Sequence, residues 1–162
     1  FGATGGVMEA ALRSAYYLAT GSNPDPDAFR AVRGMDGWRE AEFMLDQTKL
    51  KIAVAHGLGN ARKLIEALRR GEVSYDFVEV MACPGGCVGG GGQPIHDGEG
   101  LGEVRGSRLY TLDSASALRF SHENPSVLKC YEDYLGSPLS HRAHELLHTD
   151  HNAWKMPAEE RS

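Results

Sequence analysis

The feature that most constrains the fold is a strand–helix–strand succession in the middle of the chain. Residues 50–55 alternate as a half-buried strand does, and residues 77–81 form a second short apolar run. Between them, residues 61–70 carry Leu64 and Leu68 on one helical face. A helix of about ten residues between two strands predicts a βαβ unit, in which the strands are parallel and the crossover is right-handed.

Helical and strand patterns also account for most of the rest of the chain. We predict a helix over residues 7–19, a short segment over 28–32, a strand over 40–45, and helices over roughly 105–117, 125–135 and 139–148. The fold class is therefore α/β, with a small, largely parallel sheet, the βαβ crossover and several C-terminal helices. Residues 1–150 are expected to form one lobe, followed by a tail over 151–162 that carries no regular pattern.

Composition and charge exclude several classes of function. The net charge of -5 argues against a nucleic-acid partner, because phosphate binding needs clustered Lys and Arg. No apolar run approaches the roughly 18 residues that a membrane helix needs, so we expect no membrane insertion. The three cysteines are an odd number, which indicates free or metal-bound thiols rather than a disulfide framework. These thiols favour a reducing compartment, and we expect the protein to be cytoplasmic.

The sharpest chemical signal is the stretch that follows the strand over 77–81. Cys83 and Cys87 are separated by three residues and stand just beyond the carboxyl end of that strand, where open α/β sheets place their ligand sites. Of the 20 glycines in the chain, six lie between residues 85 and 92. Backbone without Cβ atoms can approach a bulky inorganic cluster closely, and thiolates are the usual ligands of iron–sulfur clusters.

The spacing of the cysteines alone leaves two other interpretations open. Cys83 and Cys87 fit an ordinary pair of cysteines in a turn, or part of a zinc site. A structural zinc site needs four Cys or His ligands. His56 and His96 are available, although neither has the close pairing that is typical of a zinc motif.

The residues around the cysteines resemble the third active-site signature of iron-only hydrogenases. That signature reads E-x-M-x-C-x-x-G-C-x-x-G-G-G-Q-P, and every fixed position is met between Glu79 and Pro94. The segment from Phe1 to Arg13 resembles the start of a helix in the same family. Residues 121–125 and 143–149 resemble the family's C-terminal helices, so the resemblance covers nearly the whole chain.

The resemblance implies a specific cofactor and reaction. In this family a four-iron four-sulfur (4Fe-4S) cluster is joined through a cysteine sulfur to a diiron subcluster, and together they form the H-cluster. By the match, Cys83 would ligate the four-iron cluster, and Cys87 would ligate it and bridge to the two irons. Met81 and Phe1 would lie against the diiron site and limit solvent. Cys87, Met81 and Phe1 are the expected catalytic residues, and the implied reaction converts two protons and two electrons reversibly into dihydrogen.

The glycine run extends the expected site beyond the thiols. By the same resemblance, the residues expected to contact the cofactor together with the two cysteines are Gly91, Gly92 and Gln93.

The chain also departs from the family's full pattern. The family takes two further cluster cysteines from signatures that contain T-S-C-C-P and M-P-C, and neither occurs here. The chain begins at Phe1 rather than Met, and we expect it to be the second lobe of a longer catalytic subunit. The expected partners are the N-terminal lobe of that subunit and a ferredoxin or a flavin- or NAD(P)-linked electron-transfer subunit. Alone, the chain would hold no cluster or an incomplete one and would not turn over hydrogen.

Three rival functions remain. A hydrogenase-like iron–sulfur assembly protein or a sensory relative would bind a cluster without hydrogen turnover, and a purely structural domain would bind none. The opening over residues 1–6 and the turn over residues 84–86 look more like true hydrogenases.

Three other features have simpler interpretations. Gly57 and Gly59 resemble part of a dinucleotide-binding loop, but Arg62 stands where its third glycine is expected. We therefore expect these glycines to form a tight turn between strand and helix. Cys130 is expected to be a packed structural residue. The C-terminal histidines are expected to form a solvated helix face, namely His141, His144, His148 and His151.

Overall fold

The computed structural model describes residues 1–97, 99–150 and 153. The chain forms two compact units, residues 1–121 and residues 122–162. The first unit contains the sheet and the cysteine pair. Apart from Ala153, the predicted tail over 151–162 lies outside the described residues. Within the described residues, no helix combines the length and the apolar character that crossing a bilayer requires.

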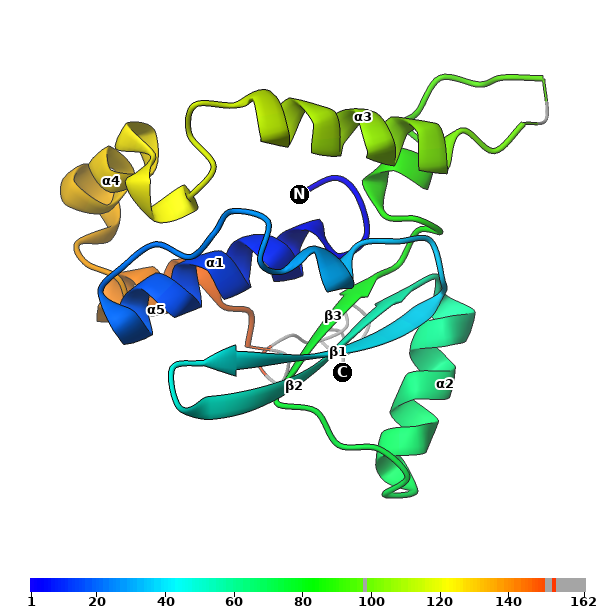
Figure 1. Ribbon diagram of the computed structural model, residues 1–162, viewed down its shortest axis with the longest axis horizontal. Coiled ribbons are helices and arrows are strands. Elements are labelled where there is room, and N and C mark those ends of the chain that lie inside the picture. Colours follow the sequence, from blue (N-terminus) through cyan, green and yellow to red (C-terminus); the bar gives the residue numbers. More distant parts are fainter. Residues whose placement is uncertain (98, 151–152, 154–162) are drawn as a thin grey trace, which may run out of the picture. The chain divides into compact units, whose positions relative to one another are not determined.

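The regular elements of the first unit follow the predicted order (Figure 1). They are α1 (Gly6–Thr20), β1 (Trp38–Leu45), β2 (Thr48–His56), α2 (Leu58–Arg69), β3 (Phe77–Met81) and α3 (Gly102–Ala115). The short segment predicted over 28–32 is a 3₁₀ helix at Arg30–Val32. Each predicted element is therefore confirmed, and its ends shift by a few residues.

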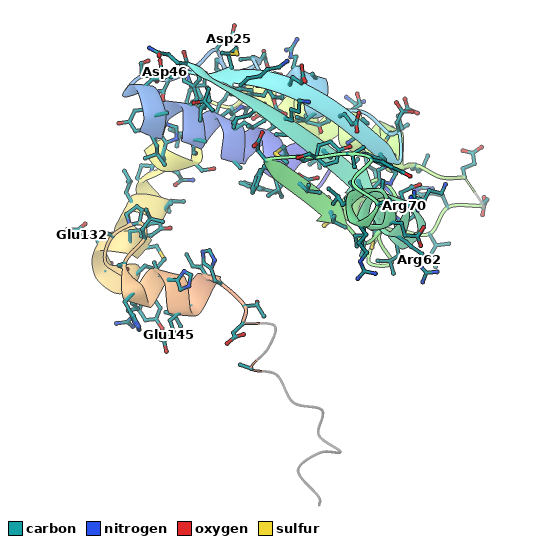
Figure 2. The ribbon with its side chains drawn as sticks, turned by 90° about the horizontal axis from the view of Figure 1, so that it is seen from below. Asp25, Asp46, Arg62, Arg70, Glu132 and Glu145 are labelled. Carbon is teal, nitrogen blue, oxygen red and sulfur yellow. The ribbon has the colours of Figure 1, made fainter. Side chains whose placement is uncertain are left out.

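The three strands form one sheet in the order β1-β2-β3. Strands β2 and β3 are parallel and α2 connects them, so the predicted βαβ unit is confirmed. Strands β1 and β2 are antiparallel, because only Asp46 and Gln47 separate them and parallel strands need a long crossover. Asp46 has a φ of 53° and lies at the tip of this hairpin (Figure 2). The α/β sheet is thus mixed rather than largely parallel.

Strand β2 is buried on both faces. Ile52 and Val54 pack with Met8 of α1, whereas Ala53 packs with Leu64 of α2. This follows from the alternation of side chains along a strand, which sends neighbouring residues to opposite faces. Helices α1 and α2 therefore cover opposite faces of the sheet (Figure 1).

The parallel pair brings two strand ends to one edge of the sheet. His56, at the end of β2, lies opposite Met81, at the end of β3. The N–H of Gly57 donates to the Met81 carbonyl at 2.9 Å. The segment that carries the cysteines therefore leaves the sheet beside the start of α2.

The second unit contains α4 (Pro125–Cys130), a π-helix at Tyr131–Leu135 and α5 (His141–Leu147). The helix predicted over 125–135 thus changes its hydrogen-bonding pattern after Cys130. The prediction that Cys130 is packed was wrong, because this cysteine is exposed. His141, His144 and His148 are exposed, as predicted, and His151 lies outside the described residues.

Candidate metal centre

The cysteine loop, residues Cys83–Pro94, begins two residues after β3 ends. The Gly86 N–H donates to the Cys83 carbonyl at 3.0 Å, and Cys87–Gly89 form a 3₁₀ turn. Both thiols are free and exposed. Gly85, Gly86 and Val88 are buried beneath them. The loop therefore has a packed underside and an open side that carries the two sulfur atoms.

The N-terminal segment packs against the underside of the cysteine loop. Three backbone contacts join the two: Ala3 bridges Gly86 as an antiparallel pair, the Thr4 N–H donates to the Gly85 carbonyl at 2.9 Å, and the Val88 N–H donates to the Gly2 carbonyl at 3.1 Å. Phe1, at the end of this segment, is 73% exposed. The fold thus places the segment of Phe1 beside the cysteines, although more than 80 residues separate them in the sequence.

The glycines of the loop serve two different purposes. Gly86 has a φ of 91°, and a Cβ atom there would lie 2.7 Å from the Met81 sulfur. A Cβ atom on Gly89 would overlap the Pro84 carbonyl oxygen at 2.0 Å. Gly91 and Gly92 meet nothing within 4 Å. Packing therefore requires the first two glycines, while the last two leave open space.

Space next to the thiols is what a bulky cluster needs. A Cβ atom on Gly90 would lie 3.5 Å from the Cys83 sulfur, so this sulfur already has bare backbone beside it. Gln93 folds back, and its Nε2 donates to the Cys87 carbonyl at 3.0 Å. Two exposed thiols with a glycine wall fit an iron–sulfur cluster better than a compact zinc ion.

Glu79 connects β3 to the start of α1. Its Oε1 accepts from the Gly5 N–H and its Oε2 from the Met8 N–H, both at 2.6 Å. The first N–H groups of a helix have no partner within the helix, and the N-cap residue Gly5 has no side chain to offer one. A buried carboxylate from the strand therefore caps the helix and complements its dipole. The sequence marked Glu79 only as a position of the motif.

His56 supports the cysteine loop from below. Its Nδ1 accepts from the Gly85 N–H at 2.8 Å, so Nε2 carries the proton and donates to the Met35 carbonyl at 3.0 Å. Both ring nitrogens are engaged, which removes His56 from the set of zinc ligands. His96 is exposed. Among the described residues, no three or more Cys, His, Asp or Glu side chains gather as a metal site.

Thr4 is held by two further side chains. Arg39 Nη2 donates to the Thr4 hydroxyl at 3.1 Å, and the Tyr110 hydroxyl donates to the Thr4 carbonyl at 3.3 Å. Burial lowers the pKa of Arg39 and raises the pKa of Tyr110. The Tyr110 hydroxyl therefore keeps its proton at neutral pH and remains a donor. No local pattern could have revealed these roles, because both partners are remote in sequence.

Two family models match the chain in succession. Residues 1–91 match the C-terminal domain of the iron-only hydrogenase large subunit. Residues 102–154 match the iron hydrogenase small subunit. The cysteine loop begins in the first match, and α3 begins the second.

Individual relatives agree with the family models. The chain is 54% identical over 150 residues to the NADP-reducing hydrogenase subunit HndD of Solidesulfovibrio fructosivorans. The aligned region covers 92% of this chain and 26% of that subunit. A solved structure of the FeFe-hydrogenase HydA1 from Chlamydomonas reinhardtii superposes with a TM-score of 0.71 at 47% identity, covering 92% of this chain and 44% of that one. The chain thus spans about a quarter of HndD and under half of HydA1.

A more distant relative has a different name. The cytosolic iron-sulfur assembly component 3 of Mus musculus is 34% identical over 160 residues, which is 97% of this chain and 33% of that protein. The identity is higher to the hydrogenases, and the first family model alone matches more than half of the chain. The chain therefore belongs to the iron-only hydrogenase family and corresponds to the C-terminal part of its large subunit.

Proposed function

We propose that this chain supplies two cysteine ligands of the H-cluster in a complete iron-only hydrogenase, which interconverts dihydrogen with protons and electrons. One observation carries the proposal: two free, exposed thiols lie on a single loop whose open side is lined by glycine backbone. Iron hydrogenases carry the H-cluster, a four-iron four-sulfur cluster with a diiron subcluster. With half of the ligand cysteines, the isolated chain would not turn over hydrogen.

Each residue of the site has a proposed role. Cys83 would ligate the four-iron cluster, and Cys87 would ligate it and bridge to the diiron subcluster. Met81 and Phe1 would keep water away from the two irons. Phe1 is largely exposed in this chain, so it is available to pack against a cofactor or the missing lobe.

The other loop residues would form the wall of the site. Gly91 and Gly92 leave the room that the cofactor needs, and Gln93 holds the Cys87 backbone in place. When bound, the H-cluster supplies the metal and electron chemistry of the reaction. The protein's own part is to hold the cofactor, exclude water and set its electrostatic surroundings.

The proposal extends to partners and location. The N-terminal lobe of the subunit would bring the other two cysteines, and residues 1–150 would form the second lobe. Electrons would pass to a ferredoxin or to a flavin- or NAD(P)-linked subunit, as the name of the NADP-reducing relative suggests for that protein. The free thiols favour a cytoplasmic location.

The test is iron binding by the complete subunit that contains this chain. Cys83→Ser and Cys87→Ser should each greatly reduce the iron bound after reconstitution with iron and sulfide, because the cluster loses a thiolate. Cys130→Ser is the matched control, since this exposed cysteine lies in the second unit and should leave iron binding unchanged. Unchanged iron content in both loop variants would disprove the proposal.

The assembly relative motivates a second candidate function. A protein of that kind would bind a cluster through the same cysteines without producing hydrogen. Hydrogen evolution with a reduced viologen dye separates the two, measured on the complete subunit after the diiron subcluster has been inserted, because iron and sulfide alone can supply only the four-iron cluster. Evolution that depends on Cys87 supports the hydrogenase, whereas cysteine-dependent iron binding without hydrogen supports the second candidate.

A further inference from the structure

We propose that Arg105 of α3 is a positioning residue for the cysteine loop. Its Nη1 donates to the Val88 carbonyl at 3.1 Å, and its Nη2 donates to the Pro94 carbonyl at 2.9 Å. The two carbonyls flank the glycine run over 89–92. One side chain therefore ties together both ends of the part of the loop that carries no side chains of its own.

The physical need for such a tie comes from the glycines. Gly loses more conformational freedom on folding than any other residue, and it has no side chain to pack. Gly91 and Gly92 are exposed and contact nothing that an added Cβ atom would meet. The order of this run must therefore come from backbone hydrogen bonds, such as that of the Gly90 N–H to the Cys87 carbonyl, and from contacts at its ends. A planar guanidinium, with its fixed fork of donors, can hold two carbonyls at a set separation.

Helix α3 also holds the other side of the site. Gly106 packs against Ala3, which pairs with Gly86, and Tyr110 holds the Thr4 carbonyl. Arg105, Gly106 and Tyr110 thus fix the cysteine loop both directly and through the N-terminal segment. A helix from the part that matches the small subunit braces a site in the part that matches the large subunit.

The charge of Arg105 adds a second effect. In the described part of the chain, no carboxylate forms an ion pair with this guanidinium. Its positive charge is directed at the backbone of the cysteine loop. A fixed cation near a cluster favours the reduced, more negative state, so removing it should make the reduction potential more negative. The assignment of Arg105 to a cluster site rests on the proposed function.

The first experiment needs no iron. Hydrogen exchange is measured on peptides spanning residues 87–94 in the iron-free complete subunit. In the Arg105→Gln variant, the amide hydrogens of these peptides should exchange about tenfold faster than in wild type, because two hydrogen bonds to the loop are weakened or lost. Arg105→Lys keeps the charge but lacks the fork, so its exchange should stay several-fold faster than wild type. Arg108→Gln, on the exposed side of α3, is the matched control and should not change exchange.

Two exchange results would overturn the positioning role. One is wild-type exchange in Arg105→Gln, and the other is complete rescue by Arg105→Lys, which would show that the fork is not needed. Both results are independent of iron, so they test Arg105 even if the cysteines bind no cluster. Loss of the proposed function is detected separately, by iron content that does not depend on Cys83 and Cys87.

The second experiment uses the iron-loaded subunit and measures its paramagnetic resonance and reduction potential. Arg105→Gln should shift the potential to a more negative value and change the resonance, while Arg105→Lys should restore the potential but not the loop exchange. Arg108→Gln should match wild type in both. A resonance and potential identical to wild type in Arg105→Gln would refute a role at the cluster.

Discussion

The N-termini of helices α1 and α5 are both capped by a side chain, but the two capping residues lie at very different distances along the sequence. The N-cap of α5 is Ser140, whose hydroxyl accepts from the Ala143 N–H three residues later at 3.1 Å. The N-cap of α1 is Gly5, and its cap is the Glu79 carboxylate, 74 residues away along the chain. The first cap can form within an isolated segment. The second exists only when β3 lies beside α1.

The difference extends to the units that contain these helices. In the second unit α4 is also capped locally, by Asn124, whose side chain accepts from the Ser126 N–H at 2.9 Å. In the first unit, buried Glu9 and Arg13 of α1 form ion pairs, and Arg13 also pairs with Asp113 of α3. Polar contacts between remote segments therefore hold the unit with the candidate site. Its loss of structure should be cooperative, whereas the second unit should respond locally.

The largest expected effect is that of Glu79→Gln. The neutral amide of Gln lacks the negative charge that is favourable at the helix start. Its NH2 group would also face the N–H of Gly5 or of Met8, and that backbone donor would lose its acceptor. We expect the free energy of unfolding of the first unit to fall by about 3 kcal/mol, measured by urea denaturation. The control is Glu72→Gln, an exposed residue paired with Arg70, which should leave stability unchanged. Equal effects of the two substitutions would contradict the remote cap.

Asp113→Asn should have the next largest effect, and it should depend on pH. Partial burial raises the pKa of Asp113, but hydrogen bonds from Arg13 and Arg119 outweigh this effect and lower the pKa from 3.8 to about 2. The unfolded state therefore binds the proton more readily, so the carboxylate stabilises the fold fully above pH 4 to 5 and loses this effect as the pH falls toward 2. We expect a loss of about 1 to 2 kcal/mol at pH 7.

Denaturation at several pH values checks this expectation. Between pH 5 and about 2, the stability of Asp113→Asn should fall less steeply than that of wild type. Asp46→Asn is the control, because Asp46 lies at the hairpin tip (Figure 2) and forms no ion pair among the described residues. Parallel pH profiles for Asp113→Asn and wild type would rule out this contribution.

Ser140→Ala should have a smaller and local effect. It removes the cap of α5 and a hydrogen bond to the Leu135 carbonyl, at a cost of about 1 kcal/mol. Amide exchange should accelerate in α5 alone, while peptides from α1 and β3 keep wild-type rates. Ser137→Ala, in the preceding turn, is the matched control. Faster exchange throughout the first unit would break the contrast between local and remote caps.

The smallest effect belongs to Glu145→Gln. Glu145 projects from α5 (Figure 2), and its side chain is 69% exposed. It faces His141 at 3.9 Å, and the His141 side chain is 96% exposed. Exposed pairs of this kind contribute little, so thermal denaturation should detect no change. A clear loss of stability would show that charges on the second unit matter more than their exposure suggests.

The comparison of the caps also explains what could be predicted. The helices and strands could be predicted because hydrophobic periodicity is set by a few neighbouring residues. The Asn124 cap of α4 is equally local, because its side chain accepts from the N–H two residues later. The Glu79 cap could not be predicted, because nothing near Gly5 in the sequence indicates a carboxylate from another strand. The antiparallel pairing of β1 and β2 was not predicted, although the predicted strands over 40–45 and 50–55 are separated by only four residues, which are too few for a parallel crossover.

The sequence by itself determined the βαβ unit, the helices, the cysteine loop and the family, because each depends on residue types at fixed short spacings. Only the tertiary structure decided which glycines are needed for packing, that His56 supports the loop instead of a metal, and that Arg105 ties its ends. The physical reason is that a buried polar group must find a partner somewhere in the fold. Which partner it finds depends on how distant segments pack, and short-range patterns carry no record of that.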